Sequence, residues 1–302
     1  MPITEGLELL KSRLIHDYGE QTAENIIHHM NLDRVVSFRV NTIKSNKVDV
    51  LNVLNKQQLT VEQVPWYPDA FVLTQGKEKD LEALDIYQQG HIYLQSLSSM
   101  IPPLVLQPKP KTDILDMAAA PGGKTTQIAS LTHNEAYIMA CEAQPIRAEK
   151  LKFNLEKQGT KNIQVVVNDA RKLDEYYRFD QILLDAPCSG SGTIQPKDEK
   201  SYQYFTEKLI IKSQQTQIAL LNKAIRLLKS GQTMVYSTCS ILRGENEDVI
   251  MVMMKRHKIE LIPIDLPPLH QASYLPTPLK HALLIAPNKY YEGFFIAHLR
   301  KK

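Results

Sequence analysis

Two short stretches each place a cysteine among small residues after an apolar run. The first is DAPCSGSG, with Asp185 and Cys188, and the second is STCS, with Cys239. A cysteine thiolate is a strong nucleophile where it is accessible and where its pKa is lowered. If both stretches follow neighbouring strands, the two thiols and the carboxyl group lie on adjacent loops. The residue types then suit covalent catalysis.

One reaction that asks for these groups is methylation of carbon 5 of cytosine, a carbon that is too weakly nucleophilic to react unaided. A thiolate that adds to carbon 6 gives carbon 5 carbanion character, and an acid at ring nitrogen 3 stabilises the charge that develops. A base must then remove the carbon 5 proton before the thiol leaves. Asp185, Cys188 and Cys239 supply these types of group. Cys141, at the end of an apolar run, is interpreted as a small core residue.

The stretch DMAAAPGGKTT, residues 116–126, ends like a phosphate-binding loop. Such a loop needs a glycine where this chain has Ala118, and Pro121 removes a backbone N–H of the kind that phosphates use. The alternative is a small-residue turn between a strand and a helix. Small side chains let the backbone close around a ligand at the carboxyl edge of a parallel sheet. The sequence therefore disfavours an ATPase or GTPase.

Acids follow the next two predicted strands. Glu142 suits a ribose diol, and Asp169 could meet an adenine amino group. Either acid alone would be interpreted as a solvated loop residue, but the repetition at successive strand ends favours an adenosine-type ligand. S-adenosylmethionine is such a ligand, and it carries no polyphosphate.

The elements that must position these residues alternate between strand and helix beyond residue 112. Strands are predicted at 113–117, 136–141, 163–167, 179–185, 233–238 and 293–299, and helices at 124–131, 146–159, 215–231 and 244–257. Helical segments of this length between strands imply βαβ units, and hence an α/β fold whose parallel sheet has helices on both faces.

The first 88 residues have a different pattern, with two short helices, a strand at 35–41, a helix at 48–59 and a further strand at 59–64. We therefore expect a small α+β RNA-binding domain at 1–88 and a larger domain at 89–302. Trp66 is predicted to pack. Basic residues that could meet RNA phosphates, or be merely solvated, are Arg39, Lys44, Lys47, Lys56, Lys77 and Lys79. Packing is also favoured over base stacking for Tyr202, Tyr204 and Phe205.

Bulk composition sets further limits. The chain has 302 residues, 43% of them hydrophobic and 23% charged, with a net charge of +3 that permits contact with nucleic acid. It has no apolar run long enough to span a membrane and no secretory signal. Three cysteines are too few and too dispersed for a disulfide framework or a zinc site. We expect a cytoplasmic protein with free thiols, no metal and no membrane partner, acting as a monomer.

With these residues in view, the chain resembles the NOL1/NOP2/Sun family of RNA cytosine-5 methyltransferases. The matching stretches, in family order, are SFRVNT (37–42), YLQSLSSM (93–100), ILDMAAAPGGKTTQIA (114–129), EAQPIRAEKLKFNL (142–155), NDAR (168–171), FDQILLDAPCSGSGT (179–193), VYSTCSILRGENEDVI (235–250) and GFFIAHLRK (293–301). The resemblance implies a class I methyltransferase fold, a Rossmann-like parallel sheet with a final antiparallel strand. It also implies S-adenosylmethionine as cofactor and ribosomal or transfer RNA as substrate.

The resemblance also implies a role for each matched residue. Cys239 would be the nucleophile, Cys188 would assist breakdown of the covalent adduct, Asp185 would bond the nitrogen 3 edge of cytosine, and Lys124 would help to position the base. The cofactor-binding residues would be Ala118, Ala119, Ala120, Pro121, Gly122, Gly123 and Lys124 around the methionine end, Glu142 at the ribose, Asp169 at the adenine, and Arg147 and Asp185 nearby.

The chain departs from the family pattern in two places, at Leu284 and Asn288 before the last strand and in residues 194–209 after the Cys188 loop. Both departures concern RNA contacts more than chemistry. The alternative function is a catalytically silent RNA-binding or ribosome-assembly factor that retains the cofactor pocket. Retention of Asp185, Cys188, Cys239 and Lys124 argues against such silence.

Overall fold

The computed structural model describes residues 4–302, and its backbone divides into two compact units. The first unit, unit 1, comprises 1–34, 184–264 and 271–302, and the second, unit 2, comprises 35–183 and 265–270. The predicted boundary near residue 88 stays a prediction.

Unit 2 contains a small four-stranded antiparallel sheet with the strand order β2-β3-β1-β4. Its elements are β1 (Ser37–Val40), α3 (Lys47–Lys56), β2 (Thr60–Gln63), β3 (Ala70–Gln75), α4 (Glu78–Glu82), α5 (Asp85–Gln88) and β4 (Ile92–Leu94). Phe38 and Phe71 are paired across β1 and β3 and stack in a core that also takes in Val50 and Leu54 of α3. This apolar face of α3 gives the sheet its cover.

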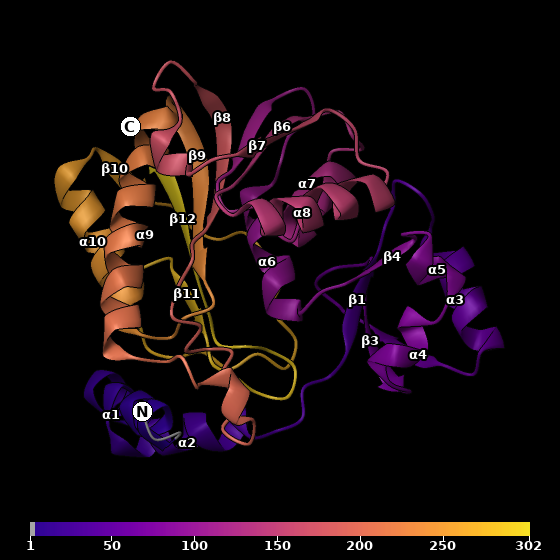
Figure 1. Cartoon of the computed structure of the whole chain (residues 1–302), viewed down its shortest axis with the longest axis horizontal. Helices are drawn as coiled ribbons and strands as arrows, with labels where there is room; N and C mark the ends of the chain where they lie inside the picture. Colours follow the sequence, from indigo (N-terminus) through magenta and orange to yellow (C-terminus); the bar gives the residue numbers. More distant parts are fainter. Residues whose placement is uncertain (1–3) are drawn as a thin grey trace. The chain divides into compact units, whose positions relative to one another are not determined.

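The remainder of unit 2 is the parallel part of a larger sheet. Its elements are α6 (Leu97–Leu106), β5 (Asp113–Asp116), α7 (Gly123–Leu131), β6 (Tyr137–Glu142), α8 (Pro145–Lys157), β7 (Ile163–Val167), η1 (Ala170–Lys172) and β8 (Phe179–Asp185). β5 pairs in parallel with both β6 and β8, and β6 pairs in parallel with β7. α7 and α8 pack against this part of the sheet (Figure 1).

Unit 1 contains the antiparallel part of that sheet. Its elements are α1 (Thr4–Tyr18), α2 (Glu20–Met30), η2 (Glu199–Ser201), α9 (Glu207–Leu227), β9 (Leu228–Thr238), η3 (Arg243–Glu245), α10 (Glu247–Arg256), β10 (Ile259–Leu261), β11 (Leu283–Ile285) and β12 (Phe294–Lys301). β12 runs antiparallel to β9, β10 and β11. α9 packs beside both α10 and β9 (Figure 1).

The larger sheet has the strand order β10-β12-β9-β8-β5-β6-β7, with β11 paired to β12. The predicted α/β class, with a mostly parallel sheet and a final antiparallel strand, is confirmed. Four strands were not predicted, namely β3, β4, β10 and β11. The helix predicted to end at Gly231 ends at Leu227 instead, because β9 starts at the next residue. Among residues 4–302, no helix has the length and apolar character that a membrane crossing requires.

His298 on β12 is a buried histidine whose Nε2 atom has no hydrogen-bond partner among the described residues. Burial, and then the nearby Arg300 charge, lower its pKa from 6.5 to about 4. In the unfolded chain, His298 binds a proton as the pH falls below 6.5. In the folded chain it does so only near pH 4. The free energy of unfolding therefore falls as the pH falls through this window, by as much as about 3 kcal/mol.

We expect His298→Leu to flatten this acid dependence, since leucine keeps the volume and removes the titrating group. Urea unfolding at about pH 7 and about pH 4.5 measures it, with the exposed His16→Gln as control. An unchanged difference in unfolding free energy between the two pH values in His298→Leu would contradict the assignment.

Candidate active site

The two loop cysteines meet in unit 1. The Sγ atoms of Cys188 and Cys239 lie 3.2 Å apart, and both residues are partly exposed. The two loops are also joined through backbone, because Gly192 N–H donates to the Cys239 carbonyl over 2.9 Å. The sequence therefore correctly places the two thiols on adjacent loops.

Asp185 ends β8, and its carboxylate accepts a 2.7 Å hydrogen bond from the Ser237 hydroxyl near the end of β9. The backbone continues this link, since Ala186 N–H donates to the Ser237 carbonyl over 2.8 Å. Asp185 therefore stands at the start of the loop that carries Cys188. The link fixes the carboxylate at the strand end.

The environment of the cysteines differentiates them. The neighbouring Cys239 thiol, and then burial, raise the pKa of the Cys188 thiol well above its usual 9.0. Cys141 is wholly buried in β6, and burial raises its pKa to about 12. The interpretation of Cys141 as a core residue agrees with this burial, and a thiol of that kind is chemically inert.

The turn between β5 and α7 lies in unit 2 and is built from small residues. Ala119 and Ala120 are buried against Leu151 and Leu155 of α8. Gly122 has φ of +108°, and a Cβ atom there would approach the Leu151 side chain to 3.1 Å. Only glycine suits this position, because a left-handed backbone and a close neighbour coincide. The turn thus brings the start of α7 close to α8.

Glu142, Arg147 and the turn form one connected group. The buried Glu142 carboxylate accepts from Gln144 N–H over 2.9 Å and lies 3.6 Å from the Arg147 guanidinium. Arg147 in turn donates to the Ala120 carbonyl over 2.8 Å. The structure therefore brings Arg147 and Glu142 to the predicted cofactor turn within the same unit.

Asp169 follows β7 and caps the short helix η1. Its carboxylate accepts from Arg171 N–H and pairs with the Arg171 guanidinium at 2.6 Å. The Arg171 side chain is the main cause that lowers the pKa of Asp169. Asp169 is therefore held at a strand end as an ionised acid, and an adenine amino group would have to share it with Arg171.

Lys124 occupies the first turn of α7, where its ammonium donates to the Ser99 hydroxyl of α6 over 2.7 Å. The next residue, Thr125, donates to the buried carboxylate of Asp116 at the end of β5 over 2.7 Å. Both ends of the turn are thus tied to neighbouring elements.

Arg39 is not a phosphate contact. Its side chain is fully buried, 0% exposed, and donates to Gln95, to the Gly123 carbonyl and to the Thr126 hydroxyl. The guanidinium also lies 5.1 Å from the centre of the Tyr93 ring. The expectation for Arg39 is therefore wrong, because this residue links β1 to the start of α7 inside unit 2. The five lysines considered with it are exposed.

The aromatic predictions are mostly confirmed. Trp66 is buried and stacks with Tyr67. Tyr202 and Phe205 are buried, as packing requires, whereas Tyr204 is exposed.

The two departures before the last strand have structural explanations. Leu284 is buried within β11. The Asn288 side chain accepts from the backbone N–H groups of Tyr290 and Tyr291 and donates to the Gln271 carbonyl. Asn288 therefore shapes the loop that leads into β12.

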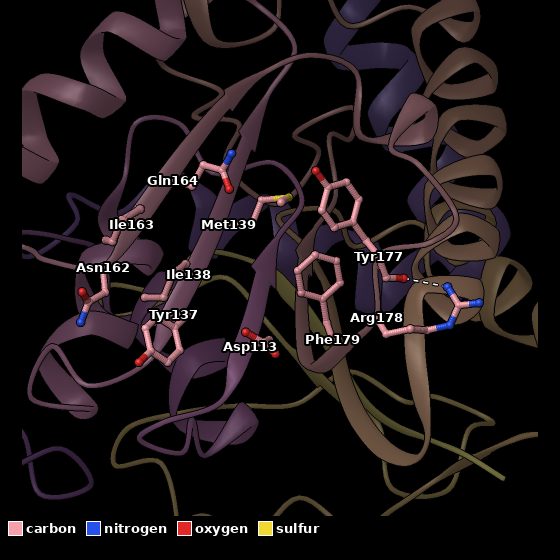
Figure 2. A pocket seen from close by; sticks show the side chains of 10 residues that line it. All are labelled: Asp113, Tyr137, Ile138, Met139, Asn162, Ile163, Gln164, Tyr177, Arg178 and Phe179. Atoms are coloured by element: carbon pink, nitrogen blue, oxygen red, sulfur yellow. Dashed lines mark hydrogen bonds between the residues drawn. The ribbon is translucent and has the colours of Figure 1, made fainter.

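A cavity of about 590 Å³ in unit 2 does not coincide with the predicted site. Figure 2 shows its lining residues, among them Asp113, Tyr137, Ile163 and Phe179, each the first residue of its strand. The predicted site residues instead lie at or just beyond the last residues of these strands, as Glu142 at the end of β6 and Asp169 after β7 do. The cavity therefore opens at the opposite edge of the parallel strands. Nowhere in residues 4–302 do three or more histidine, cysteine or acidic side chains form a group suited to a metal ion.

Glu245 was not identified from the sequence. It lies in η3, is 0% exposed, and contacts residues next to both cysteines. A glutamate in a polar stretch such as RGENED gives no sequence signal of burial.

Two parts of the chain match known protein families. Residues 103–300 match the family described as 16S rRNA methyltransferase RsmB/F. Residues 8–78 match the ferredoxin-like domain of RsmF/B-like methyltransferases, in keeping with the four-stranded sheet of unit 2.

Among curated relatives, ribosomal RNA small subunit methyltransferase F of Shewanella amazonensis is 35% identical over 92% of this chain and 60% of its own length. The Shewanella loihica protein of the same name is 33% identical over 96% of this chain and 63% of its own length. The chain thus spans somewhat under two thirds of these relatives.

Two solved structures from Pyrococcus horikoshii are similar over nearly their whole length. A methyltransferase homologue has a TM-score of 0.84 and 34% identity, with 100% of both chains covered. NSun6, solved with SFG, has a TM-score of 0.84 and 25% identity, with 97% of both chains covered. The sequence match and the shared fold agree, and the chain belongs to the RsmB/F family of 16S rRNA methyltransferases, which is a family of S-adenosylmethionine-dependent enzymes.

Proposed function

We propose that this protein transfers a methyl group from S-adenosylmethionine to carbon 5 of a cytosine in the RNA of the small ribosomal subunit. The single observation that carries the proposal is the 3.2 Å contact between Cys188 and Cys239, with Asp185 held at the start of the Cys188 loop. Methylation of an amino group needs no thiol. Methylation of carbon 5 uses a thiol as the nucleophile, an acid at nitrogen 3 and a second thiol in the breakdown of the adduct.

In this proposal the Cys239 thiolate adds to carbon 6 of the cytosine. The 3.2 Å contact between the two Sγ atoms supports the division of roles, because it holds Cys188 beside the sulfur that would form the adduct. Asp185, oriented by Ser237, is the acid of this step: its protonated carboxyl group donates to nitrogen 3 and stabilises the negative charge that develops there. Once carbon 5 has been methylated, Cys188 serves as the base that takes up the carbon 5 proton. The electron pair of that C–H bond restores the ring double bond as the bond between carbon 6 and the Cys239 sulfur breaks, and Cys239 leaves as a thiolate.

S-adenosylmethionine, when bound, supplies an electrophilic methyl group on a sulfonium. The residues of unit 2 suit such a ligand, since the turn at residues 118–124 has only small side chains before Lys124 and the buried Glu142 carboxylate lies beside it. We assign the turn to the methionine end, Glu142 to the ribose and Asp169 to the adenine. Arg147 positions Glu142 and the turn, and Lys124 positions the base.

The RNA substrate follows from the family. Small-subunit ribosomal RNA is favoured over transfer RNA because the family matched by residues 103–300 is described as 16S rRNA methyltransferase, and the Shewanella relatives are named for ribosomal RNA of the small subunit. The target cytosine must be unstacked for a thiol to reach carbon 6. We propose residues 1–88 as the RNA-binding domain, with Lys44, Lys47, Lys56, Lys77 and Lys79 as exposed candidates for phosphate contacts. A modifier of ribosomal RNA would act in the cytoplasm.

The alternative, a silent assembly factor, predicts cofactor binding without transfer. The decisive experiment incubates the protein with labelled S-adenosylmethionine and 16S rRNA from cells that lack the gene, and bisulfite sequencing then locates the product. Incorporation at one cytosine supports the proposal, whereas cofactor binding without incorporation into free rRNA or assembled subunits favours the silent factor.

Cys239→Ala should abolish methyl transfer, because no other thiol is assigned to attack carbon 6. We expect the rate to fall on the order of 10³-fold or more, measured as labelled methyl incorporated into RNA. Cys141→Ala is the matched control and should keep the wild-type rate. An active Cys239→Ala enzyme would remove the nucleophile assignment.

Cys188→Ala should trap the covalent intermediate, since the adduct can form while its breakdown is slowed. Under turnover conditions we expect a protein–RNA species that survives a denaturing gel and that disappears in the double variant with Cys239→Ala. If Cys188→Ala turns over without such a species, its role in release is refuted.

Glu142→Gln should weaken cofactor binding by about tenfold or more, because a neutral amide is a poorer acceptor for a ribose diol than a carboxylate. Calorimetric titration with S-adenosylmethionine measures the Kd. Glu149→Gln is the control, since Glu149 is an exposed glutamate of α8, the helix that follows β6. Equal Kd values for Glu142→Gln and wild type would mean that Glu142 does not hold the ribose.

A further inference from the structure

We propose that Glu245 is a positioning residue that holds the two cysteine loops together. The thiol loops are residues 186–192, which carry Cys188, and residues 239–242, which carry Cys239. The meaning of this inference for catalysis rests on the proposed function, whereas its structural content concerns unit 1 alone.

The Glu245 carboxylate bonds both thiol loops at once. One oxygen, Oε1, accepts from Ser189 N–H over 2.8 Å and from the Gln217 amide over 3.1 Å. The other, Oε2, accepts from the Ser189 hydroxyl over 2.5 Å and from the Ser240 hydroxyl over 2.7 Å. Ser189 directly follows Cys188, and Ser240 directly follows Cys239. A single carboxylate therefore fixes the residue after each thiol.

Neighbouring residues hold Glu245 itself in place. The Tyr236 hydroxyl donates to the Glu245 carbonyl over 2.7 Å, and the Gln217 amide also donates to the Pro187 carbonyl over 3.0 Å. Gln217 and Tyr236 are both wholly buried, on α9 and β9 respectively. The carboxylate is thus aimed at the thiol loops by two rigid elements.

Burial of the Glu245 carboxylate lowers the stability of the fold unless its hydrogen bonds are made. Glu245 is 0% exposed, and a buried carboxylate is tolerated only where hydrogen-bond donors compensate it. Its four donors include a backbone N–H and a buried amide, both of which would lose a partner if the carboxylate were removed. The two thiol loops would then be free to move apart. The 3.2 Å contact between the Sγ atoms requires that they stay together.

The contacts also distinguish positioning from direct chemistry. Both carboxylate oxygens are taken by groups of the protein, so Glu245 acts through Ser189 and Ser240 and not on the cytosine. A glutamine at this position keeps one oxygen for the Ser189 N–H, and its amide can donate to the two serine hydroxyls, which can rotate to accept. Positioning therefore predicts that glutamine replaces Glu245 well and alanine does not.

The experiment compares Glu245→Ala and Glu245→Gln with wild type in the full-length chain. Glu247→Ala is the matched control, since Glu247 is a buried glutamate two residues further on whose carboxylate makes no hydrogen bond to either thiol loop. In methyl transfer to 16S rRNA, we expect Glu245→Ala to lower kcat by about 100-fold while the KM for S-adenosylmethionine is unchanged. Glu245→Gln and Glu247→Ala should stay within about fivefold of wild type.

A second measurement needs no RNA. Diamide oxidises two neighbouring thiols to a disulfide and is itself reduced to the hydrazine, and mass spectrometry follows formation of the Cys188–Cys239 bond. Cys141 is buried and does not compete. We expect the rate to fall about tenfold in Glu245→Ala, because the thiols lose their high effective concentration, and to recover in Glu245→Gln.

The outcomes decide the proposal separately from the enzyme activity. A wild-type disulfide rate in Glu245→Ala, or a Glu245→Gln protein as defective as Glu245→Ala in both measurements, would overturn it. If wild type transfers no methyl group, the proposed function fails, and the disulfide rates still decide whether Glu245 holds the loops. Should Glu245→Ala fail to fold, the paired variant Ser189→Ala/Ser240→Ala replaces it, with the same slowing of disulfide formation expected.

Discussion

A buried charge must be surrounded by hydrogen-bond partners, and this constraint organises each of the two compact units around one residue. In unit 1 the residue is Glu245, whose four donors come from the thiol loops and α9. In unit 2 it is Arg39, whose guanidinium contacts Tyr93 of β4, Gln95 directly after β4, and the start of α7. Each charge draws together segments that are distant in the sequence. The two cysteine loops and the start of α7 owe their shape to these interior contacts.

Much of the fold could be predicted because most of its strands are recognisable in the sequence. Runs such as IQVVV and FDQILLD are apolar, are bounded by turn residues and alternate with helices of ordinary length. Short strands such as β10 and β11 have only three residues each, so their pairing with β12 rather than local preference determines them. The end of α9 was misplaced for a related reason, since the sequence continues to favour helix where the chain joins β9.

The site was predicted as far as residue type and strand end allow. The meeting of the two cysteines follows from the parallel order of the strands, which places loops at one edge. Arg39 and Glu245 were misjudged or missed because a charged residue in a sequence indicates solvent by default, and burial emerges only from tertiary packing. Asp169 shows a third case, in which an acid that follows a strand has a partner, Arg171, two residues away.

The close approach of Gly192 and Gly293 has a consequence for how this site can vary. A Cβ atom on Gly192 would lie 2.1 Å from the Gly293 carbonyl oxygen, and one on Gly293 would lie 2.5 Å from an Ile241 side-chain carbon. The backbone of the Cys188 loop therefore runs against the residue that leads into β12. Any natural variation here has to be collective, since a side chain gained at either glycine requires both loops and the entry to the last strand to shift together. The site's tolerance to mutation is thus set by backbone spacing as well as by the reacting groups.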